Sequence, residues 1–544
     1  MLAKIRWVVY AITFALLTAC SVSESAALPT APTDLVPRVA SVQPFLPQPQ
    51  TTSALAIPSP QPNIVFILAD DLDADSLKYM PNLKALVVDQ GTTFSNSFFN
   101  ISLCCPSRTT ILRGQYATNT HIVGNTPPSG GFQKVYADGL EKSTVAVWLQ
   151  DAGYRTMLAG KYMNGYPDKS SPMYIPPGWD EWYSAVKGNA YAELNYTLNE
   201  NGKQVAYGAE PEDYGTDVYA GKVIDFVQRT SKESTPFFVY LSVYAPHSPA
   251  TPAPRHANLF PDAKAPRSPN FNERDVSDKP AYIRNRPLLK PKQIAQIDAD
   301  YRKRLQSLQA VDEAIAKIVD TLRSTGQLDS TYIFFASDNG YHLGNHRMTQ
   351  GKVAPYEEDI RVPLIVRGPG VPSGRTLEHI VGNVDFAPTF AEVGGATIPD
   401  FVDGRSLVPL VGGNPLPSDK WRQSYLIQAG MPKTTASLTT IGLDAESPVT
   451  VTDAALLEPL DADDLDPAQQ AVGGIPPYFG IRTTDFVYVE YSTGERELYD
   501  LKTDPYQLQN IAATAKPERV KELAARLAKL RKCSGAECRI ADAR

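Results

Sequence analysis

Continuous apolar runs alternate with helical patterns through the middle of the chain. Asn63–Ala69 reads NIVFILA, and further runs lie at Phe237–Val243, Tyr332–Ala336 and Pro363–Val366. A run without polar interruption predicts a strand buried on both faces, as in a parallel sheet. Arg302–Leu322 instead repeats apolar residues at helical spacing. Strands alternating with helices predict an α/β fold, a doubly wound sheet flanked by helices.

A β-hairpin is predicted at Asn195–Tyr207, where Asn201-Gly202 lies between alternating polar and apolar residues.

The last third of the chain has a different pattern. From about Gly394 onward, turn-rich sequence leads to three short strands and a closing helix, expected at Tyr478–Arg482, Phe486–Glu490, Glu497–Leu501 and Pro517–Leu530. We expect this region to form a smaller C-terminal α+β subdomain.

An acidic stretch of low aromatic content separates the two parts of this C-terminal region. It runs from Asp444 to Gln470 and we expect it to be a mobile insertion. A calcium-binding loop is the alternative, but the stretch lacks the glycine and terminal glutamate spacing of an EF-hand.

The first twenty residues read as a targeting segment. Lys4 and Arg6 precede an apolar run, Trp7–Leu17, that is too short to span a bilayer and fits a secretory signal. The run ends in Leu17-Thr18-Ala19-Cys20, which resembles a bacterial lipobox and implies cleavage before Cys20 and lipidation of that residue. The alternative is a plain signal peptide and a secreted protein. Residues 20–62 are rich in Pro, Ser, Thr and Ala and read as an extended tether.

Charge and cysteine content narrow the choice of partners. The formal net charge of −7 gives no basic face for nucleic acid, so no nucleic-acid partner is expected. Of the five cysteines, Cys533 and Cys538 are spaced for a small loop disulfide, which suits a compartment outside the cytosol. A metal site made from these two thiols alone is the less favoured alternative.

Polar side chains directly follow three of the predicted strands. Asp70-Asp71 follow the first, Asp338-Asn339 follow the strand that ends at Ala336, and His247 follows the strand that ends near Val243. Ligands bind beyond the carboxyl ends of strands in open α/β sheets, so we expect these groups to converge. Adjacent carboxylates repel one another, and oxygen-only ligation suits Ca²⁺ or Mg²⁺. Taken alone, Asp70-Asp71 would also fit a helix cap with a solvated charge, and Asp338-Asn339 would also fit a turn.

The pentapeptide Cys104-Cys105-Pro106-Ser107-Arg108 is the most informative motif of the chain. Pro106 suits the first position of a helix that would run from Ser107 through Leu112. Cys104 would then stand just before a helix N-terminus, where an anion is favoured. The Arg108 guanidinium would lie on the first turn, within reach of the metal carboxylates.

This motif and four others together resemble the type I sulfatases of the alkaline-phosphatase-like superfamily. The nearest branch contains the N-acetylglucosamine-6-sulfatases and the extracellular 6-O-endosulfatases. The other motifs are Gly160-Lys161-Tyr162-Met163-Asn164, Ala245-Pro246-His247-Ser248-Pro249, Ser337-Asp338-Asn339-Gly340-Tyr341-His342 and Tyr356-Glu357-Glu358-Asp359-Ile360-Arg361-Val362-Pro363-Leu364. The likeness runs from about Asn63 to Asn510, and the segment from Cys533 to Arg539 extends it.

The resemblance implies a modified nucleophile and a metal. Cys104 would be oxidised to formylglycine (3-oxoalanine) by a formylglycine-generating enzyme. Ca²⁺, or Mg²⁺, would be bound by Asp70, Asp71, Asp338 and Asn339, with modified Cys104 as a further ligand. The hydrated aldehyde would attack sulfur, the alcohol would leave, and the sulfated hydrate would then collapse and expel sulfate.

The resemblance also implies the remaining roles. Arg108 would pin the modified side chain, Lys161 and Lys352 would hold sulfate oxygens, and His247 would protonate the leaving oxygen. Many sulfatases have a histidine two residues after the first lysine, whereas Lys161 is followed by Tyr162, Met163 and Asn164. The base for sulfate elimination is therefore unassigned, and the candidates, which we also expect to contact substrate, are His121 and His342.

The predicted organisation is then a lipoprotein signal peptide at 1–19, a tether at 20–62, a sulfatase domain at 63–400 and a C-terminal subdomain at 401–544 with the acidic insertion at 444–470. The protein is expected to be exported and lipid-anchored in the bacterial cell envelope. Its expected substrate is a 6-O-sulfated sugar, with aryl sulfates as generic substrates. A phosphate or phosphonate ester hydrolase of the same superfamily is the first alternative. A surface lipoprotein that binds sulfated glycans without catalysis is the second.

Overall fold

The computed structural model of the chain describes residues 61–168, 171–430 and 474–543, all within one unit, Ser53–Arg544. The predicted signal peptide, Cys20 and its lipidation, nearly all of the tether and the acidic insertion lie outside these ranges. None of the helices within them is both long enough and apolar enough to cross a bilayer.

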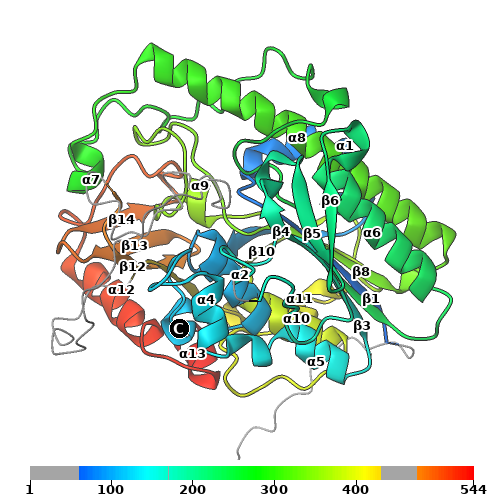
Figure 1. Cartoon of the computed structure of the whole chain (residues 1–544). Helices are drawn as coiled ribbons and strands as arrows, with labels where there is room; N and C mark the ends of the chain where they lie inside the picture. The colour runs from blue at the N-terminus through cyan, green and yellow to red at the C-terminus, as the bar shows by residue number, and fades with distance from the viewer. Residues whose placement is uncertain (1–60, 169–170, 431–473, 544) are drawn as a thin grey trace, which may run out of the picture. The chain divides into compact units, whose positions relative to one another are not determined.

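A ten-stranded sheet forms the centre of this unit (Figure 1). Its spatial order is β10-β2-β9-β8-β1-β7-β3-β4-β5-β6. The strands are β1 (Asn63–Ala69), β2 (Thr92–Phe98), β3 (Arg155–Gly160), β4 (Glu181–Gly188), β5 (Tyr196–Glu200), β6 (Lys203–Tyr207), β7 (Phe237–Ser242), β8 (Thr331–Ser337), β9 (Leu364–Arg367) and β10 (Arg375–Gly382). The central strands β8, β1, β7, β3 and β4 are parallel to one another, which confirms the α/β prediction.

The sheet is mixed, and this differs from the expectation for the run at Pro363–Val366. That run forms β9, which pairs antiparallel with both β2 and β8. The chain leaves β8 at its carboxyl end and re-enters the sheet from that same edge without a crossover helix. A return of this kind gives an antiparallel neighbour, which the apolar pattern of a buried strand does not reveal.

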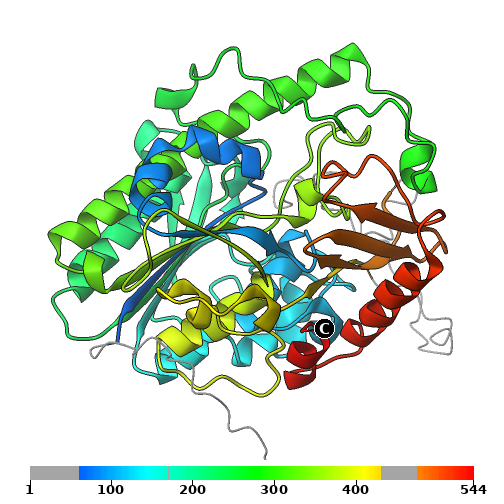
Figure 2. The same ribbon diagram turned by 180° about the vertical axis from the view of Figure 1, so that it is seen from behind.

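Both faces of β1 are buried, as its unbroken apolar sequence predicts. Alternate residues pack into separate cores: Phe66 faces α2 (Cys104–Arg113), α5 (Val145–Asp151) and α10 (Phe386–Val393), while Ile67 faces α6 (Gly215–Thr230) and α8 (Pro291–Ser324). Figures 1 and 2 show α6 and α8 on one face of the sheet and α5 and α10 on the other. The two layers of helices make the sheet doubly wound.

The predicted helix at Arg302–Leu322 is longer in the structure. It is part of α8, Pro291–Ser324, at whose start the Gln293 side chain accepts from the backbone N–H of Lys290. Only Ile297 and Tyr301 are buried before Arg304, so the first turns lack the apolar repeat used for the prediction. Caps and a proline in the first turn, rather than periodicity, mark this helix start.

The predicted hairpin is confirmed. Strands β5 and β6 pair antiparallel, with Glu200 opposite Lys203. Asn201 and Gly202, the two turn residues, have φ angles of 52° and 89°. Positive φ at both positions is the reason that Asn-Gly favours this turn.

A second sheet of four antiparallel strands forms the C-terminal subdomain, as predicted. Its strands are β11 (Ser424–Ala429), β12 (Tyr478–Thr483), β13 (Phe486–Tyr491) and β14 (Arg496–Asp500), followed by α12 (Pro517–Leu530) and α13 (Ala536–Ala541). Helix α12 lies along this sheet in both views, with Leu523, Leu527 and Leu530 buried against it (Figures 1 and 2). Cys533, in the loop after α12, and Cys538, in α13, form the predicted disulfide.

Candidate active site

The carboxyl ends of three neighbouring strands bring the predicted polar residues together. The backbone N–H of Asp71, after β1, donates to Oδ1 of Asp338, after β8, at 3.1 Å. The backbone N–H of Asp70 donates to the carbonyl of Ala245, in the loop after β7 that carries His247, at 3.3 Å. Asp71 has a φ of 62°, a left-handed conformation that is uncommon outside glycine. The convergence expected from the strand order is therefore present.

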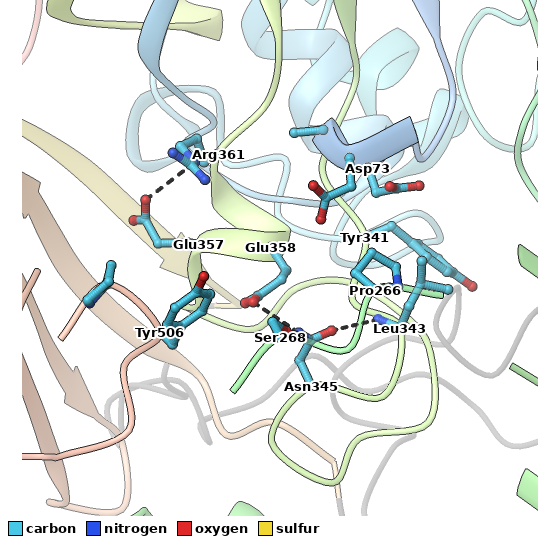
Figure 3. A pocket seen from close by; sticks show the side chains of 13 residues that line it. Asp73, Pro266, Ser268, Tyr341, Leu343, Asn345, Glu357, Glu358, Arg361 and Tyr506 are labelled. Atoms are coloured by element: carbon cyan, nitrogen blue, oxygen red, sulfur yellow. Dashed lines mark hydrogen bonds and ion pairs between the residues drawn. The ribbon is translucent and has the colours of Figure 1, made fainter. Parts of the chain in front are cut away.

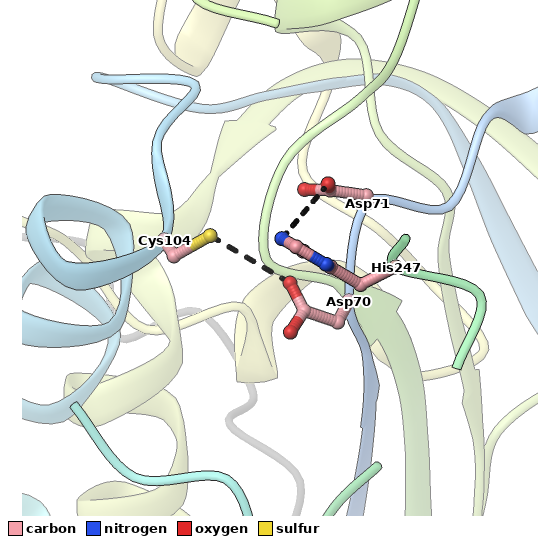
Figure 4. Close-up of side chains that lie close together, drawn as sticks. All are labelled: Asp70, Asp71, Cys104 and His247. Atoms are coloured by element: carbon pink, nitrogen blue, oxygen red, sulfur yellow. Dashed lines mark hydrogen bonds and ion pairs between the residues drawn. The ribbon is translucent and has the colours of Figure 1, made fainter. Parts of the chain in front are cut away.

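Cys104 points into this cluster from the first turn of α2 (Figure 4). Its Sγ lies 3.1 Å from Nζ of Lys352 and 3.7 Å from Oδ1 of Asp70, and the side chain is fully buried. The helix begins two residues earlier than expected, at Cys104, with Leu103 as the extended N-cap. Pro106 is tolerated inside the first turn because the N–H that it lacks would have no partner within the helix.

Cys105 faces away from the cluster. Its Sγ lies 3.9 Å from Sδ of Met163, and it belongs to the hydrophobic core under the sheet. Its N–H donates to Oδ1 of Asn125, and burial raises the pKa of its thiol to about 12. The geometry thus assigns the two adjacent cysteines different surroundings, a charged one for Cys104 and an apolar one for Cys105.

Arg108, one turn further along α2, connects three strand ends. Its Nε donates to Oδ2 of Asp338 at 3.0 Å, and its Nη2 lies 2.9 Å from the same oxygen. Its Nη1 donates to Oγ of Ser242 at 2.6 Å and to the carbonyl of Lys161 at 3.1 Å. The side chain is buried, so its fixed charge compensates the carboxylates at short range.

Each of the two predicted lysines contacts one of the adjacent aspartates. Nζ of Lys161 lies 2.6 Å from Oδ2 of Asp70, and Nζ of Lys352 lies 2.8 Å from Oδ1 of Asp71. Gly160, just before Lys161, has a φ of 109°, and a Cβ there would lie 1.8 Å from the carbonyl oxygen of Ser242. Only glycine allows β3 to approach β7 so closely and direct Lys161 into the cluster.

The three histidines singled out in the sequence differ in placement. His247 is buried, with Nδ1 2.8 Å from the carbonyl of Ser248 and Nε2 3.6 Å from Oδ2 of Asp71. Since a carbonyl can only accept, Nδ1 carries the proton in the neutral ring and Nε2 faces the cluster. His342 is also buried, with Nδ1 2.9 Å from Oδ1 of Asp359. His121, by contrast, is exposed just beyond α3 (Ala117–Thr120).

Opposite charges set the ionisation of the cluster. Burial opposes the charge on Asp70, but Lys161, His247 and Arg108 hold its pKa well below the ordinary range. Burial and the neighbouring Asp70 carboxylate raise the pKa of Asp338 to about 6, although Arg108 acts against this shift. Burial raises the pKa of the Cys104 thiol well above its usual range. As an unmodified thiol, Cys104 is therefore protonated and a poor nucleophile.

The cluster fits a hard divalent cation. Ligand atoms of Asp70, Asp71, Cys104 and His247 lie within 4.8 Å of one another, and all four residues are buried. Asn339 turns its amide N–H₂ toward Asp71 at 2.6 Å, while its buried Oδ1 has no hydrogen-bond partner in the described chain. An orphaned amide oxygen beside crowded carboxylates is a donor set that suits Ca²⁺ or Mg²⁺.

Three residues of the site were not found by sequence reasoning. Ser242 holds Arg108, Asp359 orients His342, and the ring of Tyr191 lies against His247 with a centroid separation of 4.5 Å. Asp359 belongs to one of the motifs, which could have indicated it. Ser242 and Tyr191 are single residues outside the motifs, and only the tertiary fold brings them to the site.

A cavity of about 380 Å³ is lined by residues that follow β1 and β8 in the sequence (Figure 3). Its walls come from the segments that follow β1 and β8, from α9 (Glu357–Ile360) and from the C-terminal subdomain. They include Asp73, Tyr341, Asn345, Glu358 and Tyr506. In the sequence, Asp73 and Tyr341 each stand two residues beyond a member of the cluster, Asp71 and Asn339.

Comparison with known proteins identifies the family of the chain. The sulfatase family model matches residues 62–396. N-acetylglucosamine-6-sulfatase of Capra hircus is 35% identical over 495 residues, which cover 90% of this chain and 86% of that protein. The extracellular sulfatase Sulf-1 homolog of Caenorhabditis elegans is 38% identical over 406 residues, 72% of this chain and 55% of the longer relative.

Solved structures show the same fold. A protein solved in complex with its substrate D-glucosamine-2-N,6-O-disulfate is 25% identical, with a TM-score of 0.68 over 87% of this chain and 98% of that one. The phosphonate monoester hydrolase of Agrobacterium radiobacter shares the fold at 21% identity, with a TM-score of 0.62 over 87% of this chain and 95% of that one. The family match, the relatives aligned along most of the chain and the converging site together show that the protein belongs to the sulfatase family, the hydrolases of sulfate esters.

Proposed function

We propose that this sulfatase removes sulfate from 6-O-sulfated sugars, and also from aryl sulfates, with Cys104 converted to formylglycine. The observation that carries the proposal is the placement of Cys104. Its side chain lies between Lys352 and Asp70, whereas Cys105 is held in the apolar core. The hydrated aldehyde would supply the nucleophile toward sulfur, a role that a buried, protonated thiol fills poorly.

The donor set supports Ca²⁺, with Mg²⁺ as the alternative. Asp70, Asp71, Asp338 and Asn339, with modified Cys104, would hold the cation, which neutralises negative charge on a bound sulfate ester. His247, whose Nε2 lies 3.6 Å from Oδ2 of Asp71, would not bind the cation and would act as a proton donor instead.

The cationic side chains would bind and orient the ester. Lys161 and Lys352 would hold sulfate oxygens, since both ammonium groups are buried and face the cluster. Arg108 would keep Asp338 ionised and in place. In its doubly protonated form, with Nδ1–H donated to the Ser248 carbonyl, His247 would transfer the second proton from Nε2 to the leaving oxygen.

For the base that removes a proton in sulfate elimination, His342 is favoured over His121. His342 is buried, is oriented by Asp359, and pairs through its backbone with Gly351, next to Lys352. His121 is exposed at the end of α3. A carboxylate partner fixes the tautomer of an imidazole and strengthens it as a base.

The sugar would occupy the cavity of about 380 Å³ whose wall includes Asp73 and Tyr341 (Figure 3). Carboxylate, amide and tyrosine side chains are suited to sugar hydroxyls and ring faces. Three relatives are named N-acetylglucosamine-6-sulfatase, and one structural neighbour was solved with D-glucosamine-2-N,6-O-disulfate as its substrate. These names support a 6-sulfated hexosamine as the substrate.

We further propose export to the cell envelope, with lipidation of Cys20 as the anchor and a plain secreted form as the alternative. Two relatives carry the word extracellular in their names. A formylglycine-generating enzyme would act on Cys104 before the domain closes, because the side chain is fully buried in the folded chain.

Replacing each cysteine in turn tests the proposal. Cys104→Ala should lower turnover of p-nitrophenyl sulfate by at least about a thousandfold, because the nucleophile is lost. Cys105→Ala, which loses only packing, should cost about 1 kcal/mol of stability and leave turnover within about threefold. Both variants are assayed for initial rate and for thermal unfolding.

The same assay with p-nitrophenyl phosphate and a phenylphosphonate ester distinguishes a sulfatase from a phosphate or phosphonate ester hydrolase. Turnover of sulfate above that of both phosphorus esters is expected. A preference for the phosphonate, or equal activity of Cys104→Ala and wild type, would contradict the proposal.

Removing the cation should lower both activity and stability. Chelation leaves the buried carboxylates of Asp70, Asp71 and Asp338 without full compensation, so the melting temperature should fall. Ca²⁺ at about one hundred times its dissociation constant should restore about 2.7 kcal/mol. The measurement is thermal unfolding with and without added Ca²⁺ or Mg²⁺.

Asn339→Ala should abolish this thermal shift, while Asn199→Ala, a buried asparagine of the β5–β6 hairpin, should keep it. A melting temperature of the chelated wild type that does not respond to either cation would rule out the site.

Removing an aromatic side chain from the cavity wall should raise KM for the sugar sulfate but not for the aryl sulfate. Tyr506 is 41% exposed, so Tyr506→Ala should fold normally. Loss of one ring contact, about 0.5–1.5 kcal/mol, should raise KM for N-acetylglucosamine 6-sulfate about two- to tenfold and leave p-nitrophenyl sulfate unchanged. Tyr136→Ala, at an exposed tyrosine outside the cavity, is the control. Equal effects on both substrates would exclude the cavity as the sugar site.

A further inference from the structure

One tyrosine ring touches both a predicted sulfate-binding lysine and the predicted general acid. Tyr191 lies in a short 3-10 turn, Ala190–Ala192, between β4 and β5, and it is 4% exposed. Its ring centroid is 4.5 Å from that of His247 and 4.7 Å from Nζ of Lys161. Together with Lys161, it also lines a small cavity of about 70 Å³.

The ring is itself held in place. Tyr244 packs against it with a centroid separation of 4.9 Å and an interplanar angle of 72°. The turn is capped by the Asn189 side chain, and the next residue, Glu193, accepts from the N–H of Thr216 at the start of α6 at 2.6 Å. The ring of Tyr191 is therefore held in place, and the side chains of His247 and Lys161 pack against it.

An aromatic face suits both neighbours. It attracts the ammonium of Lys161 by about 0.5–2 kcal/mol without adding a carboxylate that would neutralise it. Lys161 already pairs with Asp70 at 2.6 Å, and a second carboxylate would leave less positive charge for an anionic ester. Against His247 the ring limits rotation of the imidazole, which keeps Nε2 on the side of the cluster.

Tyr191 belongs to a hydrophobic core that also contains Tyr219 and Tyr196, so part of its role is packing. Those two rings contact other tyrosines: Tyr219 lies 6.2 Å from Tyr244 and from Tyr196. The contact with His247 and Lys161 is what distinguishes Tyr191 from the rest of the aromatic cluster.

We propose that Tyr191 is a positioning residue, which holds His247 for proton transfer to the leaving oxygen and Lys161 for sulfate binding. This inference rests on the role proposed for His247 above. Its consequence is a dependence on the leaving group. A poor leaving group, such as a sugar alcohol, needs the proton from His247, whereas p-nitrophenolate leaves well without it.

The test compares Tyr191→Leu with Tyr191→Phe on N-acetylglucosamine 6-sulfate and p-nitrophenyl sulfate. Tyr191→Leu should lower kcat/KM for the sugar sulfate at least about tenfold more than for the aryl sulfate. Tyr191→Phe keeps the ring and should remain within about threefold of wild type on both. If Tyr191→Leu does not fold, Tyr191→Met carries the same comparison.

A double-mutant cycle with His247→Ala shows whether Tyr191 acts through that histidine. His247→Ala alone should discriminate against the sugar sulfate, and adding Tyr191→Leu should then give no further discrimination. Tyr219→Leu, which removes a ring from the same core, should affect both substrates equally.

Equal losses on the two substrates for Tyr191→Leu, or discrimination that adds fully to that of His247→Ala, would overturn the inference. If His247→Ala itself shows no dependence on the leaving group, the proposed acid role fails, and the inference fails with it. If His247→Ala discriminates and Tyr191→Leu does not, the inference alone fails.

Discussion

The site depends on compensating three buried carboxylates at the ends of β1 and β8. Asp70, Asp71 and Asp338 are all fully or almost fully buried, and carboxylates so close together repel one another. Lys161, Lys352 and Arg108 supply opposite charge at 2.6 to 2.9 Å. Breaking such a network by removing one partner leaves an uncompensated buried charge, which costs about 3–5 kcal/mol. The lysines proposed to bind the anionic ester, Lys161 and Lys352, are thus also among the charges that stabilise this end of the sheet.

The fold brings these charges together from distant parts of the sequence. Strands β1, β7 and β8 are adjacent and parallel, so the residues following each emerge at one edge. Helix α2 begins at that edge and presents Cys104 and Arg108 to it. The loop between β14 and α12 contributes Tyr506 to the wall of the cavity of about 380 Å³. A sulfate ester placed at this edge would meet Arg108, Lys161 and Lys352, cations from three separate segments of the chain.

The sequence predicts the elements whose signal is local. The unbroken apolar run of β1, the Asn-Gly turn of the hairpin and the amphipathic pattern of α12 each reflect burial or turn geometry at neighbouring positions, and each is present in the structure. The direction of β9 and the first turns of α8 depend on the path of the chain and on caps, so periodicity does not reveal them.

The same distinction holds within the site. Asp70, Asp71, Asp338 and His247 could be placed because each follows a recognisable strand. Tyr191 could not, because it comes from a turn whose position is set by its contacts with Tyr244 and α6. Nothing in its local sequence distinguishes it from the other tyrosines of the same core.

The central claim is that Cys104 acts as formylglycine. Mass spectrometry of the proteolytic peptide that spans Cys104 and Cys105, from protein purified with its maturation enzyme present, tests this most directly. We expect a peptide about 18 Da lighter than the unmodified sequence, because the side chain loses sulfur and two hydrogens and gains one oxygen when the thiol becomes an aldehyde. The fragment ions should place this change at Cys104. A fully active enzyme whose peptide carries two unmodified cysteines would contradict the claim.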